Sequence, residues 1–130
     1  MIVLYFIANT EKRLVIGTGN KSELATGYFS KFGDGGVDFL PIGDLYKTQV
    51  REMAAHLGVP NRIINKIPTA GLWPGQTDED ELGVRYEVLD RILLGIELHL
   101  TPEEIADQAE VDLKTVHRIE TRVAAGAHKR

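Results

Sequence analysis

A glycine-rich turn near the start of the chain has residues that could bind an anion. Gly17-Thr18-Gly19 follows a short apolar run and precedes Asn20, where the pattern predicts the start of a helix. Free backbone amides and the positive end of a helix dipole at such a turn favour an anion such as phosphate. The same residues are equally consistent with a plain connection between a strand and a helix, so the turn alone leaves both interpretations open.

Glu23 and Lys47 are charged residues that could each take part in binding a phosphorylated ligand. The Glu23 carboxylate is a hard oxygen ligand suited to Mg²⁺, which commonly joins a protein carboxylate to a substrate phosphate. Glu23 could instead complete a capping box with Asn20. Lys47 lies in the first turn of a helix that we expect to begin after Asp44, where a cation opposes the helix dipole. A bound polyphosphate would compensate for that position, and the alternative is an exposed lysine without a ligand.

A second glycine-rich segment, residues 31–36, lies between two charged residues. A tight backbone there could approach a substrate closely, with Lys31 and Asp38 fixing its charged and hydroxyl groups. A glycine hairpin with solvated charges is the commoner structure for such a segment.

The elements expected to position these residues alternate strands with helices. Apolar runs at residues 14–17 and 37–42 predict two short buried parallel strands. Helices are expected to begin near Asn20, Asp44 and Pro60. This order, followed by helices, predicts an α/β fold, although two strands make an incomplete sheet.

The second half of the chain begins with a long irregular loop over residues 69–83, rich in proline, glycine and acidic residues. Compact domains seldom carry such a loop without a function, for example as a lid. Its acidic run, 78–81, is interpreted as a solvated face, with Asp78 also suited to cap a helix. Three further helices are expected to begin near Tyr86, Thr101 and Asp112.

Composition narrows the function classes. The 130 residues carry a net charge of −4 and contain no cysteine, which excludes disulfides, cysteine-ligated zinc and thiol catalysis. The mild acidity gives no support for a nucleic acid or a membrane surface as partner. The apolar start, Met1 to Ala8, is too short to span a bilayer and lacks the basic flank of a signal peptide. We therefore expect one cytoplasmic domain, and the apolar start suggests that something once preceded it.

Residues 101–119 have a spacing close to that of a helix-turn-helix DNA-binding motif. Glu110 stands where the usual turn glycine would be, and it accepts left-handed geometry poorly. The helix that would enter the groove is not notably basic. DNA binding is therefore the weaker interpretation, and two packed helices are the simpler one.

Five runs occur in an order and spacing that cover nearly the whole chain and resemble the ammonia-dependent NAD synthetases. They are Gly17-Thr18-Gly19-Asn20-Lys21-Ser22-Glu23, residues 28–38, residues 40–48, Pro68-Thr69-Ala70-Gly71-Leu72, and Gln76-Thr77-Asp78-Glu79-Asp80-Glu81-Leu82-Gly83. The resemblance implies a Rossmann-like sheet of the adenine nucleotide hydrolase type, assembled as a homodimer. It also implies that ATP activates deamido-NAD as an acyl-adenylate, releasing pyrophosphate, and that ammonia displaces AMP to form NAD.

The resemblance also implies roles for individual residues, none of them a covalent nucleophile. ATP would contact Thr18, Lys47 and Thr69, and Mg²⁺ would bind Glu23. Deamido-NAD would contact Lys31, Asp38, His128 and Lys129. Residues 1–83 would form the α/β nucleotide-binding part and residues 84–130 the helical part of one domain, the C-terminal portion of a NAD synthetase.

One family motif is absent from the printed sequence. The family's Ser-Gly-Gly-x-Asp-Ser pyrophosphate loop, its second magnesium carboxylate and an arginine that contacts deamido-NAD all precede the stretch that Met1 matches. We therefore expect an incomplete synthetase that is inactive alone, and the alternative is a non-catalytic remnant that dimerises or binds nucleotide. The segment from Met1 to Ala8 has strand propensity, but the family segment is helical there, and we expect a helix.

Overall fold

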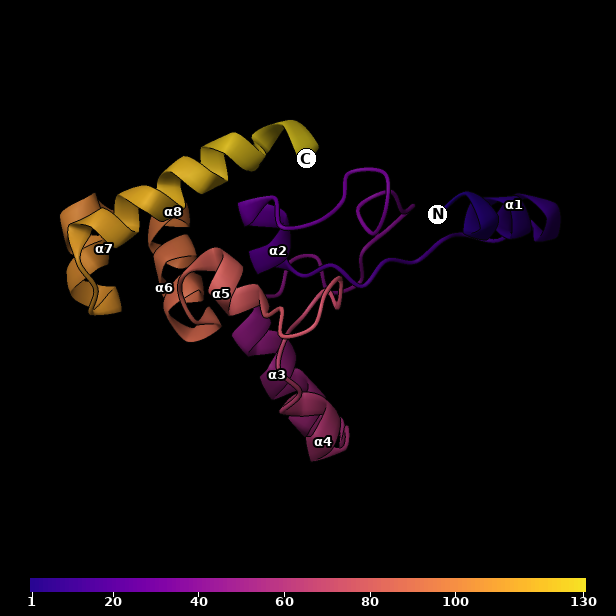
Figure 1. Cartoon of the computed structure of the whole chain (residues 1–130), viewed down its shortest axis with the longest axis horizontal. Helices are drawn as coiled ribbons and strands as arrows, with labels where there is room; N and C mark the ends of the chain where they lie inside the picture. The colour runs from indigo at the N-terminus through magenta and orange to yellow at the C-terminus, as the bar shows by residue number, and fades with distance from the viewer.

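The computed structural model describes all 130 residues and is built from helices (Figure 1). In chain order these are α1 (Ile2–Glu11), α2 (Lys21–Thr26), α3 (Lys47–His56), α4 (Asn61–Ile64), α5 (Asp78–Leu82), α6 (Tyr86–Glu97), α7 (Pro102–Ala109), α8 (Leu113–Gly126) and the 3₁₀ helix η1 (Ala127–Lys129). None of them combines the length and the hydropathy needed to cross a bilayer.

The predicted α/β fold class is wrong, because the structure contains no strand. The two apolar runs meet only in one isolated parallel bridge between Ile16 and Phe39. Ile16 is 58% exposed and Phe39 is 49% exposed. Parallel strands are stable where several pair and helices cover both faces, and neither condition holds here. The apolar runs correctly indicated extended segments that lie side by side, but not a sheet.

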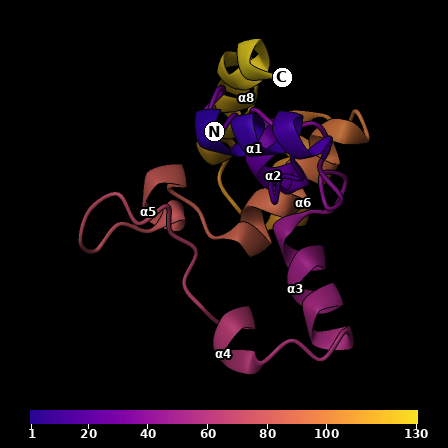
Figure 2. The ribbon, with the colours of Figure 1, turned by 90° about the vertical axis from the view of Figure 1, so that its right-hand side faces the viewer.

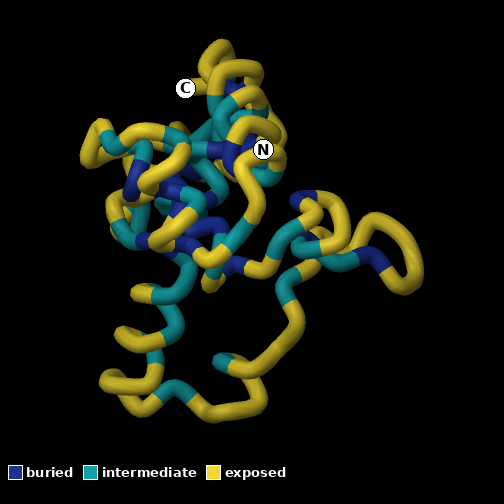
Figure 3. Tube along the Cα trace, turned by 90° about the vertical axis from the view of Figure 1, so that its left-hand side faces the viewer, coloured by how far each residue is buried: buried dark blue, intermediate teal, exposed yellow.

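The core lies in the helices of the second half, α6, α7 and α8 (Figure 3). Leu89 and Ile92 of α6 are fully buried against Ile105 of α7 and against Val116 and Ile119 of α8. The three helices begin where the sequence predicts. Strong local signals explain this success, because Thr101 and Asp112 both accept a backbone amide in the first turn of the helix that follows.

The turn between α7 and α8 spans residues 110–112. Glu110 adopts the left-handed conformation with φ 57°, contrary to the expectation that glutamate resists it. However, Arg118 and Arg122 of α8 donate to the carbonyl oxygens of Gly83 and Glu81. Their hydrogen bonds within the chain give further support to the packed-helix interpretation.

Two parts of the first half of the chain extend away from this bundle, whereas α2 packs against α6 and α8. The helix expected at the start is confirmed as α1, which lies far from α6–α8 and leaves Ile2 88% and Phe6 71% exposed (Figure 1). Figure 2 shows α3 and α4 as an arm from which the chain returns to α5. Part of the predicted loop is therefore helical, because α5 begins at Asp78 with Thr77 as its cap.

Candidate functional site

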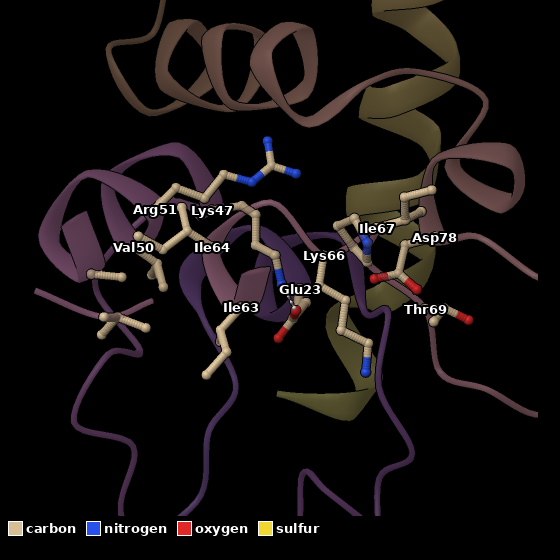
Figure 4. A pocket seen from close by; sticks show the side chains of 13 residues that line it. Glu23, Lys47, Val50, Arg51, Ile63, Ile64, Lys66, Ile67, Thr69 and Asp78 are labelled. Carbon is tan, nitrogen blue, oxygen red and sulfur yellow. Dashed lines mark hydrogen bonds and ion pairs between the residues drawn. The ribbon is translucent and has the colours of Figure 1, made fainter. Parts of the chain in front are cut away.

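Glu23 and Lys47 form an ion pair between α2 and α3 (Figure 4). Glu23 Oε1 lies 3.2 Å from Lys47 Nζ, and the two side chains are 19% and 22% exposed. Glu23 Oε2 accepts a hydrogen bond from the Asn20 amide at 3.1 Å, which completes the capping box that the sequence offered as an alternative. The carboxylate thus holds a helix end with one oxygen and a cation with the other.

A cavity of about 340 Å³ lies beside this ion pair. Thr69 lines it as well, so three of the residues expected to bind ATP or metal meet there. Arg51 and Lys66 add two further cations (Figure 4). The Asp78 carboxylate also lines the cavity. The remaining wall consists of Pro68 and apolar side chains of α3, α4 and the adjoining segments, namely Val50, Ala54, Val59, Ile63, Ile64 and Ile67. Cations beside an apolar wall can hold a polyphosphate and shield it from water.

Thr18 lies outside this cavity, on the exposed turn before α2. Two first-turn amides of α2 already have partners, because Lys21 donates to the Leu45 carbonyl at 2.8 Å and Glu23 donates to Asn20 Oδ1 at 3.1 Å. The turn therefore offers fewer free amides to an anion than its sequence suggests, and a role for Thr18 stays a prediction.

The side chains around the cavity could hold Mg²⁺ only together with a bound ligand, such as a phosphate group, that supplies further oxygen atoms. No group of three or more acidic or histidine side chains is arranged to hold a metal alone. Mg²⁺ usually keeps several waters and takes one or two protein carboxylates together with substrate phosphates. Glu23 at the cavity wall meets that requirement, provided that Oε1 exchanges Lys47 for the metal.

The residues expected to bind deamido-NAD gather elsewhere, where the C-terminal residues meet the segment after α2. Lys31 Nζ donates to the His128 carbonyl at 2.7 Å. Lys129 Nζ donates to the carbonyl oxygens of Gly27 at 2.8 Å and Phe29 at 2.9 Å. Both ammonium groups are thus held by backbone oxygens, which a bound anionic group would have to replace.

Asp38 is the one member of that set with a different environment. Its carboxylate accepts the Val15 amide at 2.7 Å and the Tyr5 hydroxyl at 3.1 Å. Burial and the hydrogen bond to Asp38 raise the pKa of the Tyr5 phenol above its ordinary value. Asp38 therefore links Tyr5 of α1 to Val15 in the extended segment before α2.

The sequence interpretation missed the burial of Asp78, which is 6% exposed and not part of a solvated face. Its carboxylate accepts hydrogen bonds from the hydroxyls of Tyr28 at 3.3 Å and Tyr86 at 3.2 Å. Burial first, and the nearby Asp78 charge second, raise the pKa of both phenols. No local signal marks this contact, because Tyr28 lies 50 residues away from Asp78 in the chain.

Two more residues were missed, Ser22 and Asp90. Both are buried, at 0% and 5% exposure, and both bond to the backbone at the start of α3. Asp44, expected to cap that helix, instead lies 3.4 Å from Lys21 in an exposed ion pair.

The profile of the NAD synthase family matches residues 1–130, the whole chain. The chain belongs to the NAD synthase family. This confirms the resemblance drawn from the five runs. The NH(3)-dependent NAD(+) synthetase of Methanococcoides burtonii is 53% identical over 130 residues, which are 100% of this chain and 49% of the relative. The corresponding enzyme of Archaeoglobus fulgidus is 67% identical over 97 residues, 75% of this chain and 39% of the relative.

Two solved structures are similar to this one. The NMN synthetase from Francisella tularensis has a TM-score of 0.82 and 43% identity, covering 99% of this chain and 49% of that structure. The NH3-dependent NAD synthetase from Campylobacter jejuni, in complex with nitrate, has a TM-score of 0.74 and 29% identity, covering 99% and 47%. The chain thus spans about half the length of these relatives and similar structures.

Proposed function

We propose that this chain contributes the C-terminal part of the site of an ammonia-dependent NAD synthetase. The observation that carries the proposal is the convergence of Glu23, Lys47 and Thr69 on one cavity in a chain of the NAD synthase family. In the proposed reaction, a carboxylate oxygen of deamido-NAD attacks the α-phosphorus of ATP and pyrophosphate leaves. Ammonia then attacks the acyl carbon, AMP leaves, and the nitrogen loses a proton to give the amide.

We propose that this chain binds the phosphate groups of ATP and neutralises their charge. Lys47 would place its ammonium against the phosphate oxygens, and the Thr69 hydroxyl would donate to the same group. Mg²⁺ bound at Glu23 would supply further charge neutralisation. Fixed cations aimed at the developing phosphate charge are the main catalytic device available here. Thr18 is proposed as an additional ATP contact from the turn before α2.

The second cluster is proposed to bind deamido-NAD. Lys31, His128 and Lys129 lie together and would contact its anionic groups, and Asp38 would accept from a hydroxyl. Residues 1–83 and 84–130 are proposed as the nucleotide-binding and helical parts of one cytoplasmic domain.

The purified 130-residue chain is expected to bind ATP without catalysing the reaction. The reason is that the chain spans about half the length of its relatives, so the residues proposed here make up only part of the site. Calorimetric titration with ATP and Mg²⁺ should show binding, and ammonia with deamido-NAD should yield neither AMP nor NAD. Release of both products would contradict the expected inactivity, and the absence of ATP binding would contradict the proposed site.

The identity of the carboxylic acid substrate is tested by calorimetric titration as well. Deamido-NAD is compared with the acid form of NMN, because one similar structure is an NMN synthetase. Tighter binding of deamido-NAD supports the dinucleotide as substrate.

We also propose a homodimer that contacts through α1. Ile2, Val3 and Phe6 of this helix are exposed by 88%, 68% and 71%. A cluster of exposed apolar side chains of this kind commonly marks an interaction surface. Sedimentation velocity should therefore give twice the chain mass, and Phe6→Glu should shift the protein to the monomer. Asn61→Glu, which adds the same charge at an exposed polar position of α4, away from α1, should leave the dimer intact. A monomeric unmodified chain would contradict this assembly.

A further inference from the structure

Helix α3, which begins with Lys47, has one capping interaction of its own, in which Gln49 Oε1 accepts the Tyr46 amide at 2.9 Å, but no side chain of α3 accepts the amides of Lys47 and Thr48. Its N-cap residue is Tyr46, whose hydroxyl donates to Glu97 Oε2 at 2.6 Å, away from the helix start. The first amides of any α-helix lack partners within the helix. A side chain from elsewhere must therefore accept them or they stay unpaired.

Two buried side chains on other helices supply these partners. Asp90 Oδ2, from α6, accepts the Thr48 amide at 2.8 Å. Ser22 Oγ, from α2, accepts the Lys47 amide at 2.9 Å and donates to Asp90 Oδ1 at 2.5 Å. Both oxygens of Asp90 are thus used, and one carboxylate ties together three helices.

This network holds Lys47 at two points through neighbouring residues of α2. Ser22 holds its backbone amide, and Glu23, the next residue, holds its ammonium at 3.2 Å. The Lys47 ammonium also lies 5.3 Å from the ring centroid of Tyr86, on the same helix as Asp90. The backbone and side chain of Lys47 are therefore both fixed by α2 and α6.

The negative charge of Asp90 also offsets the unfavourable interaction of Lys47 with the dipole of α3. A lysine as the first residue of a helix opposes the helix dipole, and an anion at that end stabilises it. Asp90 places a carboxylate there, but it is the one charged side chain among the buried residues of α6, and burying that charge is unfavourable. A capping side chain at position 46 could accept the Thr48 amide from within the chain segment of α3, but it would connect α3 to neither α2 nor α6.

We infer that Asp90 is a positioning residue for the Lys47 ammonium. It acts through Ser22 and the first amides of α3, and it sets the ammonium at the wall of the cavity where ATP phosphates are proposed to bind. The inference rests on the proposed function, because it assigns Lys47 to those phosphates. Asp90 itself lines no part of that cavity.

The test is a double-mutant cycle on the whole 130-residue chain, with ATP affinity measured by calorimetry. Asp90→Asn is expected to weaken ATP binding about tenfold, the worth of one charge-assisted hydrogen bond. In a Lys47→Met background the same substitution should change affinity less than about twofold, because no ammonium remains to be positioned. Asp107→Asn, an equal charge change at an exposed position of α7, should leave affinity unchanged.

A second variant guards against misfolding of Asp90→Asn. Ser22→Ala removes the link between Asp90 and the Lys47 amide while keeping both charges, and it should weaken ATP binding about threefold. Amide hydrogen exchange at Lys47 and Thr48 should become faster in either variant. If both variants fold and bind ATP within twofold of the unmodified chain, or lose the same affinity in the Lys47→Met background, the positioning role is overturned. Failure of the unmodified chain to bind ATP would instead overturn the proposed function.

Discussion

Replacing Lys47 with methionine is expected to weaken ATP binding by about 10- to 100-fold, the effect of losing a hydrogen bond between charged groups. Methionine keeps the length of the side chain and removes only the charge, so the cavity wall keeps its shape. The loss should exceed the direct contact, because Glu23 is then left facing the phosphates without its cation. Isothermal calorimetry with ATP and Mg²⁺ measures the change.

Lys114→Met is the matched control for Lys47→Met. It makes the same chemical change at an exposed position of α8, where the residue does not line the cavity. If general attraction between the protein and ATP mattered more than position, both variants would lose affinity equally. Equal losses, or binding by Lys47→Met within twofold of the original, would contradict the proposed role.

Replacing Gly126 with alanine is expected to destabilise the protein by about 2 kcal/mol, a typical cost of overpacking. Helix propensity alone predicts the opposite sign, a gain of about 1 kcal/mol, because Gly126 lies at the end of α8 with an ordinary helical backbone. A Cβ there would lie 2.9 Å from the Gly27 Cα and 3.0 Å from the Thr26 carbonyl oxygen, both backbone atoms that cannot rotate aside. Gly27 itself has φ 65° and does not accept a larger residue easily.

Urea unfolding measures this change in the free energy of unfolding. Ala124→Gly, at an exposed position of the same helix, gives the size of the propensity effect alone and should cost about 1 kcal/mol. The two variants should therefore both destabilise, although they are opposite substitutions. A more stable Gly126→Ala protein would show that α2 and α8 do not approach as closely as described.

The parts of the fold that follow from the sequence are those set by nearby residues. The capping boxes at Asn20 and Thr101 involve partners three residues away, so their pattern is visible in the chain. The starts of α7 and α8 follow for the same reason, whereas α6 follows from the spacing of its apolar residues. The predicted sheet failed because pairing depends on neighbours distant in the chain, which an apolar run does not reveal.

The candidate site divides in the same way. Glu23 and Lys47 can be picked out from the sequence. Lys47 opposes the dipole of the helix that it begins, and Glu23 lies three residues after Asn20, at the capping-box spacing. Asp90 gives no such signal, since its partners Ser22 and Thr48 lie 68 and 42 residues away. The ligand-binding roles themselves come from family resemblance and remain proposals, because a side chain's position does not state which molecule it binds.

The contacts of Lys31 and Lys129 have a consequence for the order of folding. Their hydrogen bonds join residues 97 and 102 positions apart. Closing so long a loop costs entropy before its contacts contribute anything. The contacts among α6, α7 and α8 join residues that are closer in the chain and carry a smaller entropic cost. We therefore expect these helices to pack first and the segment after α2 to dock onto them. The segment after α2 then acquires its final shape last, which makes the proposed deamido-NAD cluster a late product of folding.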